Sequence, residues 1–414
     1  MPEAIRITDL AKPELDETQR AILAFGQTLE VQLDADNILD EAKKSVSLDD
    51  FGPEDFRQRL DLLCDEWGKD EGLNNLGRMS LRNKLVLFAR NRLLIQDLLK
   101  RHPEIHDVEI RAPIIVAGLP RSGTTHLLNL MAADTRLRAL PLWESYEPVP
   151  MPGEAMLPDG TDPRYQRCAD AWEMMQQTVP KLAAMHPMNP DHIHEELELM
   201  GPDFASYNFE WLCQCPRWRD HYYASDQTPH YEYMKTVLKI LTWQDGDDGS
   251  STRWVLKCPQ HLEQLRVLQR VFPDATVAVT HRDPVAVIQS AATMIAYGQR
   301  MSRHSIDLAN IIEYWSDRVL HLLECCARER RSLAEDQSID VPFHEFMADD
   351  IAMVEKIYAK AGLPMTASAR SQLQQFIAEH PRGKHGRVVY NLRQDYGVDP
   401  EAISRRIGKS LINN

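Results

Sequence analysis

Over the first hundred positions of the chain, apolar residues recur mainly at spacings of three and four. Leu81, Leu85 and Leu98 belong to one such series. This spacing places apolar side chains on one face of an α-helix, so the pattern predicts helices over residues 14–101. We therefore expect residues 1–110 to form a helical N-terminal region.

After Pro113 the pattern changes to short apolar runs that alternate with helical stretches. The runs lie at residues 114–117, 254–256 and 276–280, and each is followed by a stretch with helical spacing. Strands that alternate with helices usually pair in a parallel sheet that helices cover. The sequence therefore predicts an α/β fold in which residues 111–414 form three layers around a central parallel sheet, with helices on its faces.

The charge balance limits the classes of partner. The chain carries 62 acidic and 47 basic residues, a formal net charge of −15. Nucleic acids and anionic membrane surfaces attract proteins with an excess of Lys and Arg, so neither is expected as a partner. An anionic ligand must therefore meet a local basic pocket.

Cysteine usage and the N-terminal residues indicate a compartment. The seven cysteines are an odd number and include no C-x-x-C pair, which fits a reducing cytoplasm. The first residues lack the basic start and apolar run of a signal peptide, and no run of roughly 20 apolar residues is present. We expect a cytoplasmic protein that is not integral to a membrane. The sequence leaves open whether it forms a homo-oligomer.

A phosphate-binding loop is indicated by Gly118–Thr125, which reads GLPRSGTT between an expected strand and an expected helix. Glycines allow a tight turn, and the helix N-terminus offers free N–H groups and a partial positive charge. A nucleoside-triphosphate P-loop has a Lys where Thr124 stands here. The cation is instead Arg121, which suits a donor with one phosphate and one sulfuryl group. The alternative is a simple strand-to-helix connection.

The loop resembles the P-[KR]-S-G-T-T motif of the sulfotransferases that use 3′-phosphoadenosine 5′-phosphosulfate (PAPS). This resemblance implies a P-loop-like fold and makes residues 111–414 a sulfotransferase catalytic domain. It also implies that the 5′-phosphosulfate is held by Arg121, Ser122, Gly123, Thr124 and Thr125.

A second segment, Thr280–Ser290, resembles the 3′-phosphate element of this family, which makes Arg282 and Ser290 the expected ligands of that phosphate. An Arg at a strand end can pair with phosphate oxygens, and a hydroxyl two helical turns later can reach a neighbouring oxygen. Taken alone, each could equally be a surface ion-pair or capping residue. Residues 382–387 form a loose version of the family's late basic run. They add three candidate ligands, Lys384, His385 and Gly386.

A third segment, Trp254–Leu262, resembles the family's strand end with a Lys that holds the sulfuryl oxygens. Lys257 is its counterpart by position, and with Arg121 it is expected to stabilise the charge that develops as the S–O bond breaks. The alternative is a solvated strand end. This segment and residues 390–397 look more like bacterial members of the family than like animal steroid or phenol enzymes.

Sulfuryl transfer also needs a base close to the acceptor. In the smaller cytosolic relatives, a His two positions after the Lys acts as this base. In this chain Pro259 occupies that position, and His261 is the nearest histidine. Some carbohydrate-acting relatives use a Glu, and Glu195 and Glu196 lie between the two phosphate motifs. The alternative is that both are solvated residues in the first turn of a helix. The base is therefore expected among Glu195, Glu196 and His261.

A metal site is not expected. His192, His194 and Glu195 lie close in the sequence, but the chain has no H-E-x-x-H spacing and the chemistry does not require a metal.

An aromatic-rich stretch over residues 204–233 is a weaker indication of where the acceptor binds. Such residues more often pack in a core than line a pocket. If they line a pocket, a lipophilic alcohol or a glycolipid would suit it.

Together the segments imply a sulfotransferase that moves the sulfuryl group of PAPS to a hydroxyl or amine of a small acceptor. The transfer would be a direct in-line displacement that releases 3′-phosphoadenosine 5′-phosphate (PAP). Two other classes stay open. A P-loop kinase or nucleoside triphosphatase would need a Lys at position 124 and a carboxylate for Mg²⁺. A nucleotide-binding regulatory protein would need neither Lys257 nor a base.

Overall fold

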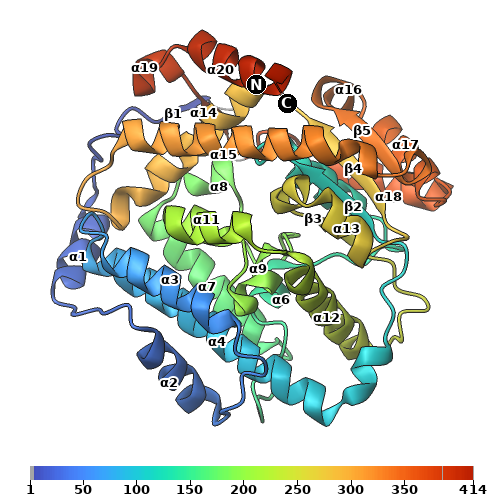
Figure 1. Ribbon diagram of the computed structural model, residues 1–414, viewed down its shortest axis with the longest axis horizontal. Coiled ribbons are helices and arrows are strands. Elements are labelled where there is room, and N and C mark those ends of the chain that lie inside the picture. Colours follow the sequence, from blue (N-terminus) through green and yellow to red (C-terminus); the bar gives the residue numbers. More distant parts are fainter. Residues whose placement is uncertain (1–3, 385, 414) are drawn as a thin grey trace.

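The computed structural model describes residues 4–384 and 386–413 and contains a parallel sheet of four strands, which lies at the upper right of Figure 1. The strands lie in the order β3-β2-β4-β5. Their bounds are Ile114–Gly118 for β2, Val255–Lys257 for β3, Thr276–His281 for β4 and Ser338–Pro342 for β5. Because β2 pairs with both β3 and β4, the segments that follow these three strands meet at one edge of the sheet.

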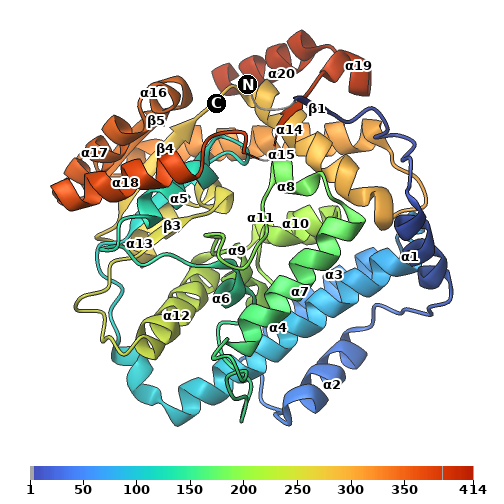
Figure 2. The same ribbon diagram turned by 180° about the vertical axis from the view of Figure 1, so that it is seen from behind.

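Both faces of this sheet are buried, which explains why its strands read as continuous apolar runs. Ile114 and Val116 of β2 belong to one core, and Ile115 and Ala117 belong to the other. The first core is covered by α5 (Thr124–Ala132), α16 (Phe343–Ala348), α17 (Asp350–Lys360) and α18 (Ala367–Glu379). The second is covered by α13 (Leu265–Val271), α14 (Pro284–Gly298) and α15 (Leu308–Glu329) (Figure 2). The predicted three-layer α/β fold is therefore confirmed.

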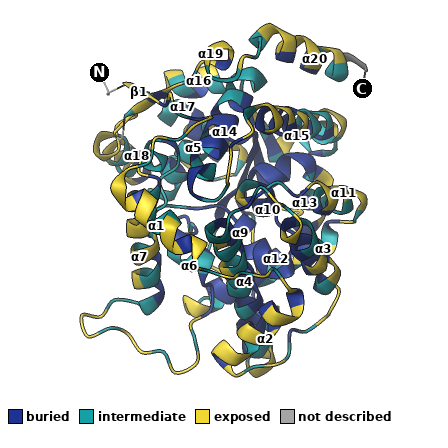
Figure 3. Ribbon diagram, turned by 90° about the vertical axis from the view of Figure 1, so that its left-hand side faces the viewer, coloured by how far each residue is buried: buried dark blue, intermediate teal, exposed yellow. Residues whose placement is uncertain are grey.

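The first hundred residues are largely helical, as their spacing predicts. The helices are α1 (Glu17–Gln27), α2 (Ala35–Val46), α3 (Phe56–Gly68) and α4 (Asn75–Arg101), and the 3₁₀ segment η1 (Pro103–Asp107) follows. They share the larger core with the sheet, and their outer faces are exposed (Figure 3). The division of the chain at residue 110 stays a prediction. None of the described helices combines the length and the apolar character that a membrane span requires.

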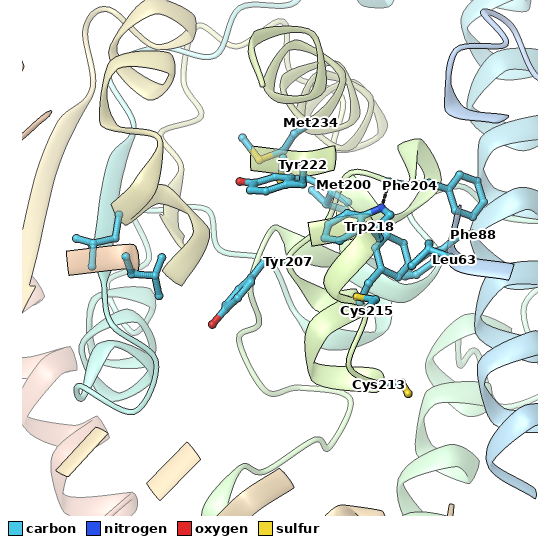
Figure 4. Packing of buried hydrophobic residues seen from close by; sticks show 14 of the residues in the cluster. Leu63, Phe88, Met200, Phe204, Tyr207, Cys213, Cys215, Trp218, Tyr222 and Met234 are labelled. Carbon is cyan, nitrogen blue, oxygen red and sulfur yellow. Dashed lines mark hydrogen bonds between the residues drawn. The ribbon is translucent and has the colours of Figure 1, made fainter. Parts of the chain in front are cut away.

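Further helices, of 3 to 17 residues, fill the space between the N-terminal helices and the sheet. They are α6 (Leu142–Tyr146), α7 (Pro163–Thr178), α8 (Leu182–Met185), α9 (Leu197–Met200), η2 (Gly201–Asp203), α10 (Asn208–Leu212), α11 (Pro216–Ala224) and α12 (Thr228–Gln244). Figure 4 shows Phe204, Tyr207, Trp218 and Tyr222 of the aromatic-rich stretch among the apolar side chains of this layer. All four are buried, so these rings pack in the core and offer no surface to an acceptor.

Three strands leave no clear trace in the sequence pattern. β5 is an edge strand in which only Ser338 and Val341 are buried. β1 (Ala4–Arg6) and β6 (Arg387–Val389) form a separate parallel pair, and three residues are too few to display a period of two. The remaining elements are η3 (Pro259–Glu263), η4 (Gln299–Met301), η5 (Arg330–Ser332), η6 (Glu335–Gln337), α19 (Leu392–Tyr396) and α20 (Pro400–Asn413).

A buried ion network holds the segment that follows β3. Arg318 of α15 donates to Glu210 Oε1 at 2.7 Å and to Glu263 Oε1 at 2.6 Å, and none of the three side chains contacts solvent. Burial alone would lower the pKa of Arg318, but the two carboxylates raise it well above its ordinary value. Because Glu263 lies in η3, directly after β3, the network fixes the end of the strand that carries Lys257.

Candidate active site

The loop between β2 and α5 lies against the end of β4. A Cβ atom on Gly118 would lie 1.9 Å from Thr280 Oγ1, so only glycine permits this approach. Ser122 Oγ donates to the backbone oxygen of Leu119 at 2.5 Å and is hydrogen-bonded to Thr280 Oγ1 at 2.9 Å. The loop is therefore fixed relative to β4.

The backbone of the loop is shaped to bind an anion. Arg121 and Gly123 have positive φ values of 62° and 84°. No side chain caps α5, so the backbone N–H groups of its first turn, at Thr124 and Thr125, are open to a ligand. The strained Arg121 is the kind of conformation that persists where the surroundings hold it for a purpose.

The predicted ligands of the two phosphates meet at this loop. Arg121 Nε donates to Ser290 Oγ at 3.1 Å, and another nitrogen of its guanidinium donates to the backbone oxygen of Met185 at 2.5 Å. Arg282 donates to the backbone oxygen of Arg121 and stacks over the ring of Phe343, 4.3 Å from its centroid. The three side chains come from the loop, from the end of β4 and from α14.

The two guanidinium groups form a positive cluster. Neither Arg121 nor Arg282 makes a salt bridge with any residue in 4–384 or 386–413. Burial, and then the charge of Arg121, lower the pKa of Arg282. In a chain with a net charge of −15, two half-buried cations that form no salt bridge among the described residues favour an anionic ligand.

Lys257, at the end of β3, is buried rather than solvated, with only 1% of its surface exposed. Its ammonium donates to Thr125 Oγ1 at 3.1 Å and is paired with the carboxylate of Glu195. The ammonium therefore lies beside the first turn of α5 and faces the loop.

The other two candidate bases, Glu196 and His261, are hydrogen-bonded to each other, and Glu196 is also bonded to the backbone of Lys257. Glu196 accepts hydrogen bonds from the backbone N–H of Lys257 at 2.9 Å and from His261 Nε2 at 3.0 Å. The second ring nitrogen of His261 is 2.9 Å from the hydroxyl of Tyr231. Glu195 and Glu196 precede the short helix α9 but are 8% and 1% exposed, so the alternative of two solvated residues is wrong. Of the three candidates, only Glu195 reaches the ammonium of Lys257.

Three histidines lie close together near Glu195 in this part of the molecule: His192 and His194, which the sequence analysis considered only as metal ligands, and His186, which it did not consider. The ring centroids of His186 and His192, and of His186 and His194, are 5.7 Å apart. Burial, and then neighbouring positive groups that include Lys257, lower the pKa of His192 to about 4 and the pKa of His186 and His194 well below the ordinary value. All three are therefore neutral near pH 7.

This trio has unused hydrogen-bonding atoms. His192 Nε2 and His194 Nδ1 are buried and have no hydrogen-bond partner among the described residues. No group of three or more His, Cys, Asp or Glu side chains within the described part of the chain is arranged to hold a metal. The H-x-H-E-E pattern of residues 192–196 was the available sequence signal.

The late basic segment contains the three further candidate ligands of the 3′-phosphate. Lys384 is exposed, and no hydrogen bond joins it to Arg282 or Ser290 within the described residues. Gly386 has a φ of 91° at the turn before β6, and His385 lies outside the described residues. The side chain that reaches the cluster is Tyr390, whose hydroxyl accepts a hydrogen bond from Ser290 Oγ at 3.0 Å.

With this geometry in place, residues 113–367 match the model of the sulfotransferase family, and the chain belongs to that family. It is therefore an enzyme that transfers a sulfuryl group, which leaves the kinase and regulatory alternatives without support.

Two solved structures are similar over nearly the whole chain. Sulfotransferase STF1 of Mycobacterium tuberculosis H37Rv is 29% identical, with a TM-score of 0.77, and the match covers 93% of this chain and 100% of that one. Sulfotransferase STF9 of Mycobacterium avium is 24% identical, with a TM-score of 0.80, and the match covers 93% and 98%. The comparison with curated protein sequences finds no similar sequence.

Proposed function

We propose that the protein transfers the sulfuryl group of PAPS to a hydroxyl or amine of a small acceptor and releases PAP. One observation carries this proposal. Two guanidinium groups that form no salt bridge among the described residues, a glycine-shaped loop and a buried ammonium lie together at the carboxyl edge of the parallel sheet. That arrangement suits a donor with an anionic group at each end of its ribose.

In this proposal the loop holds the 5′-phosphosulfate of the donor. The backbone N–H groups of Ser122, Gly123, Thr124 and Thr125 and the guanidinium of Arg121 bind its oxygens. Arg282 and Ser290 bind the 3′-phosphate. Lys384, His385 and Gly386 remain candidates that would have to move toward the donor.

The transfer step is an in-line displacement at sulfur. An acceptor oxygen or nitrogen forms a bond to sulfur while the bond between sulfur and the bridging oxygen breaks, and both electrons of that bond stay on the 5′-phosphate of PAP. The ammonium of Lys257 stabilises the charge that grows on this oxygen. Arg121, which belongs to the loop itself, adds a second positive charge, so the proposed step requires no metal.

Glu195 is the proposed base. Its carboxylate is paired with Lys257, and the sulfuryl oxygens of a bound donor would compete for the same ammonium. A carboxylate freed in this way can accept the proton that leaves the acceptor. Glu196 and His261 instead hold the end of β3 in place, because their hydrogen bonds are made to each other, to the backbone and to Tyr231.

The proposal leaves the acceptor at the level of a hydroxyl or an amine. The buried aromatic rings give no reason to prefer a lipophilic or glycolipid acceptor. All seven cysteines are free and buried, which supports the proposed cytoplasmic location.

The test is turnover of labelled PAPS by the purified chain with a panel of alcohols, phenols and amines, alongside ATP with Mg²⁺. Release of PAP with label on one acceptor class would support the proposal. Phosphoryl transfer from ATP, with no consumption of PAPS under any condition, would overturn it.

A further inference from the structure

The N-terminal strand β1 is linked to the cluster of Arg121 and Ser290 through β6, because Tyr390, the residue after β6, is hydrogen-bonded to Ser290. β1 pairs in parallel with β6, with Ile5 opposite Val388. Two segments that are more than 380 residues apart in the sequence are thus joined at the candidate donor site.

A chain of hydrogen bonds links the cluster to the residue that follows β6. Arg121 Nε donates to Ser290 Oγ, and Ser290 Oγ donates to the hydroxyl of Tyr390. Because the Tyr390 oxygen acts as acceptor here, its own proton is left to donate elsewhere. No acceptor for that proton is found among the described residues. A phenol hydroxyl that can still donate, at the edge of a cationic cluster, suits an anionic oxygen.

Tyr390 directly follows β6, which is held by its pairing with β1, by contacts with α8 and by the burial of Val388. Within the described residues, β1 is the only strand that pairs with β6. A two-stranded sheet of three residues is not stable by itself, so β1 must be held by other contacts.

Those contacts are present in the residues that follow β1. Ile7 and Leu10 are buried in the larger core. Asp9 accepts hydrogen bonds from Arg300, at 3.2 and 3.3 Å, directly after α14. Burial would raise the pKa of Asp9, but these bonds outweigh it and lower the pKa, so the pair is ionised near neutral pH. The residues after β1 are therefore anchored to η4, the 3₁₀ segment that directly follows the helix of Ser290.

We propose that Tyr390 is a further ligand of the donor's 3′-phosphate and that β1 is the positioning strand that holds it there. This inference rests on the proposed function, because the ligand is the PAP part of PAPS. It gives the N-terminal residues, which carry no family motif, a part in donor binding.

The experiment is a calorimetric titration of the full chain and its variants with PAP. Tyr390→Phe removes the hydroxyl and should raise the Kd roughly 10-fold, as expected for one hydrogen bond to a charged group. Tyr396→Phe is the matched control, because it removes a tyrosine hydroxyl that bonds Thr293 on the same helix at 3.2 Å without touching Ser290. Its Kd should stay within about two-fold of the wild type, since it makes no contact with the phosphate.

The role of β1 is tested with a shortened chain that begins at Ile7. This variant keeps the buried Ile7 and Leu10 and the pair of Asp9 with Arg300. Its Kd should also rise roughly 10-fold, because Tyr390 would lose its position. Ile5→Pro replaces this variant if the shortened chain does not fold, because proline cannot donate a strand hydrogen bond. Thr8→Ala, an exposed change next to the strand, is the control.

The outcomes separate this inference from the proposed function. Tight PAP binding by the wild type with an unchanged Kd in Tyr390→Phe would overturn the ligand role alone. An unchanged Kd in the shortened chain would overturn the role of β1. A wild type that does not bind PAP would overturn both the inference and the proposed function.

Discussion

Replacement of Lys257 by methionine tests how the site divides donor binding from transfer. Methionine is unbranched and apolar like the Lys stem, so the change removes the ammonium and leaves the packing nearly intact. The lost contacts are the hydrogen bond to Thr125 at 3.1 Å and the pair with Glu195.

The expected loss in turnover follows from the position of the ammonium. A preorganised donor aimed at charge that develops in the transition state contributes about 100-fold to 1,000-fold in kcat, so turnover of PAPS should fall by that factor. PAP lacks the sulfuryl group, so its Kd should stay within about three-fold of the wild type. The assay compares labelled sulfuryl transfer with calorimetric titration of PAP.

A structural effect must be separated from this chemical one. Removal of one partner leaves Glu195, which is 8% exposed, without its cation, and such a loss costs about 3 kcal/mol or more unless the carboxyl group becomes protonated. The double variant Lys257→Met/Glu195→Leu removes the unpaired charge, so it should recover stability without recovering turnover. Turnover equal to that of the wild type, in a folded Lys257→Met variant, would refute the role of the ammonium.

Three further predictions concern residues that hold the candidate active site in place. Gly118→Ala should lower the free energy of unfolding by about 2 kcal/mol and weaken PAP binding, because its Cβ would meet Thr280 Oγ1. Adding Thr280→Ala should restore part of the lost stability, as measured by urea titration. A Gly118→Ala variant with unchanged stability would contradict the close approach. Arg318→Met should cost about 3–5 kcal/mol in the same assay, because Glu210 would be buried without a cation and Glu263 would keep only His321, at 3.3 Å. Burial lowers the pKa of His192 to about 4 in the folded protein, against 6.5 as its ordinary value in the unfolded chain. Its contribution to the free energy of unfolding should therefore be fully present above pH 6.5 and should fall by ~3 kcal/mol as the pH drops toward about 4. His192→Gln should flatten the pH dependence of unfolding in this window, and an unchanged slope would show that His192 is not held neutral.

The strands that could be predicted from the sequence are those buried on both faces of the sheet. β2, β3 and β4 are covered on both faces, so their apolar runs are visible, and the helices after them follow the spacing of three and four. β5 lies at an edge and exposes Asp340, which interrupts its run. β1 and β6 are too short to give a pattern, and their pairing depends on distant contacts such as that of Asp9 with Arg300.

The candidate site shows the same division. The loop motif and the Arg282 segment could be recognised from the sequence, and the structure brings Arg121, Arg282 and Ser290 together. The burial of Lys257 could not be predicted, because a Lys at a strand end is usually solvated and its partner Glu195 lies 62 residues away. The contact between Tyr390 and Ser290 is equally hidden, since it depends on how the last segment crosses α14.

The central claim is that the cluster at the edge of the sheet binds the nucleotide of PAPS. The most direct measurement is a calorimetric titration of the wild type and of Arg282→Ala with PAP, and separately with ATP plus Mg²⁺. The account predicts micromolar-range binding of PAP by the wild type, no response to ATP, and roughly 10-fold or greater loss of PAP affinity in a folded Arg282→Ala variant. Tight Mg²⁺-dependent binding of ATP without binding of PAP would contradict it.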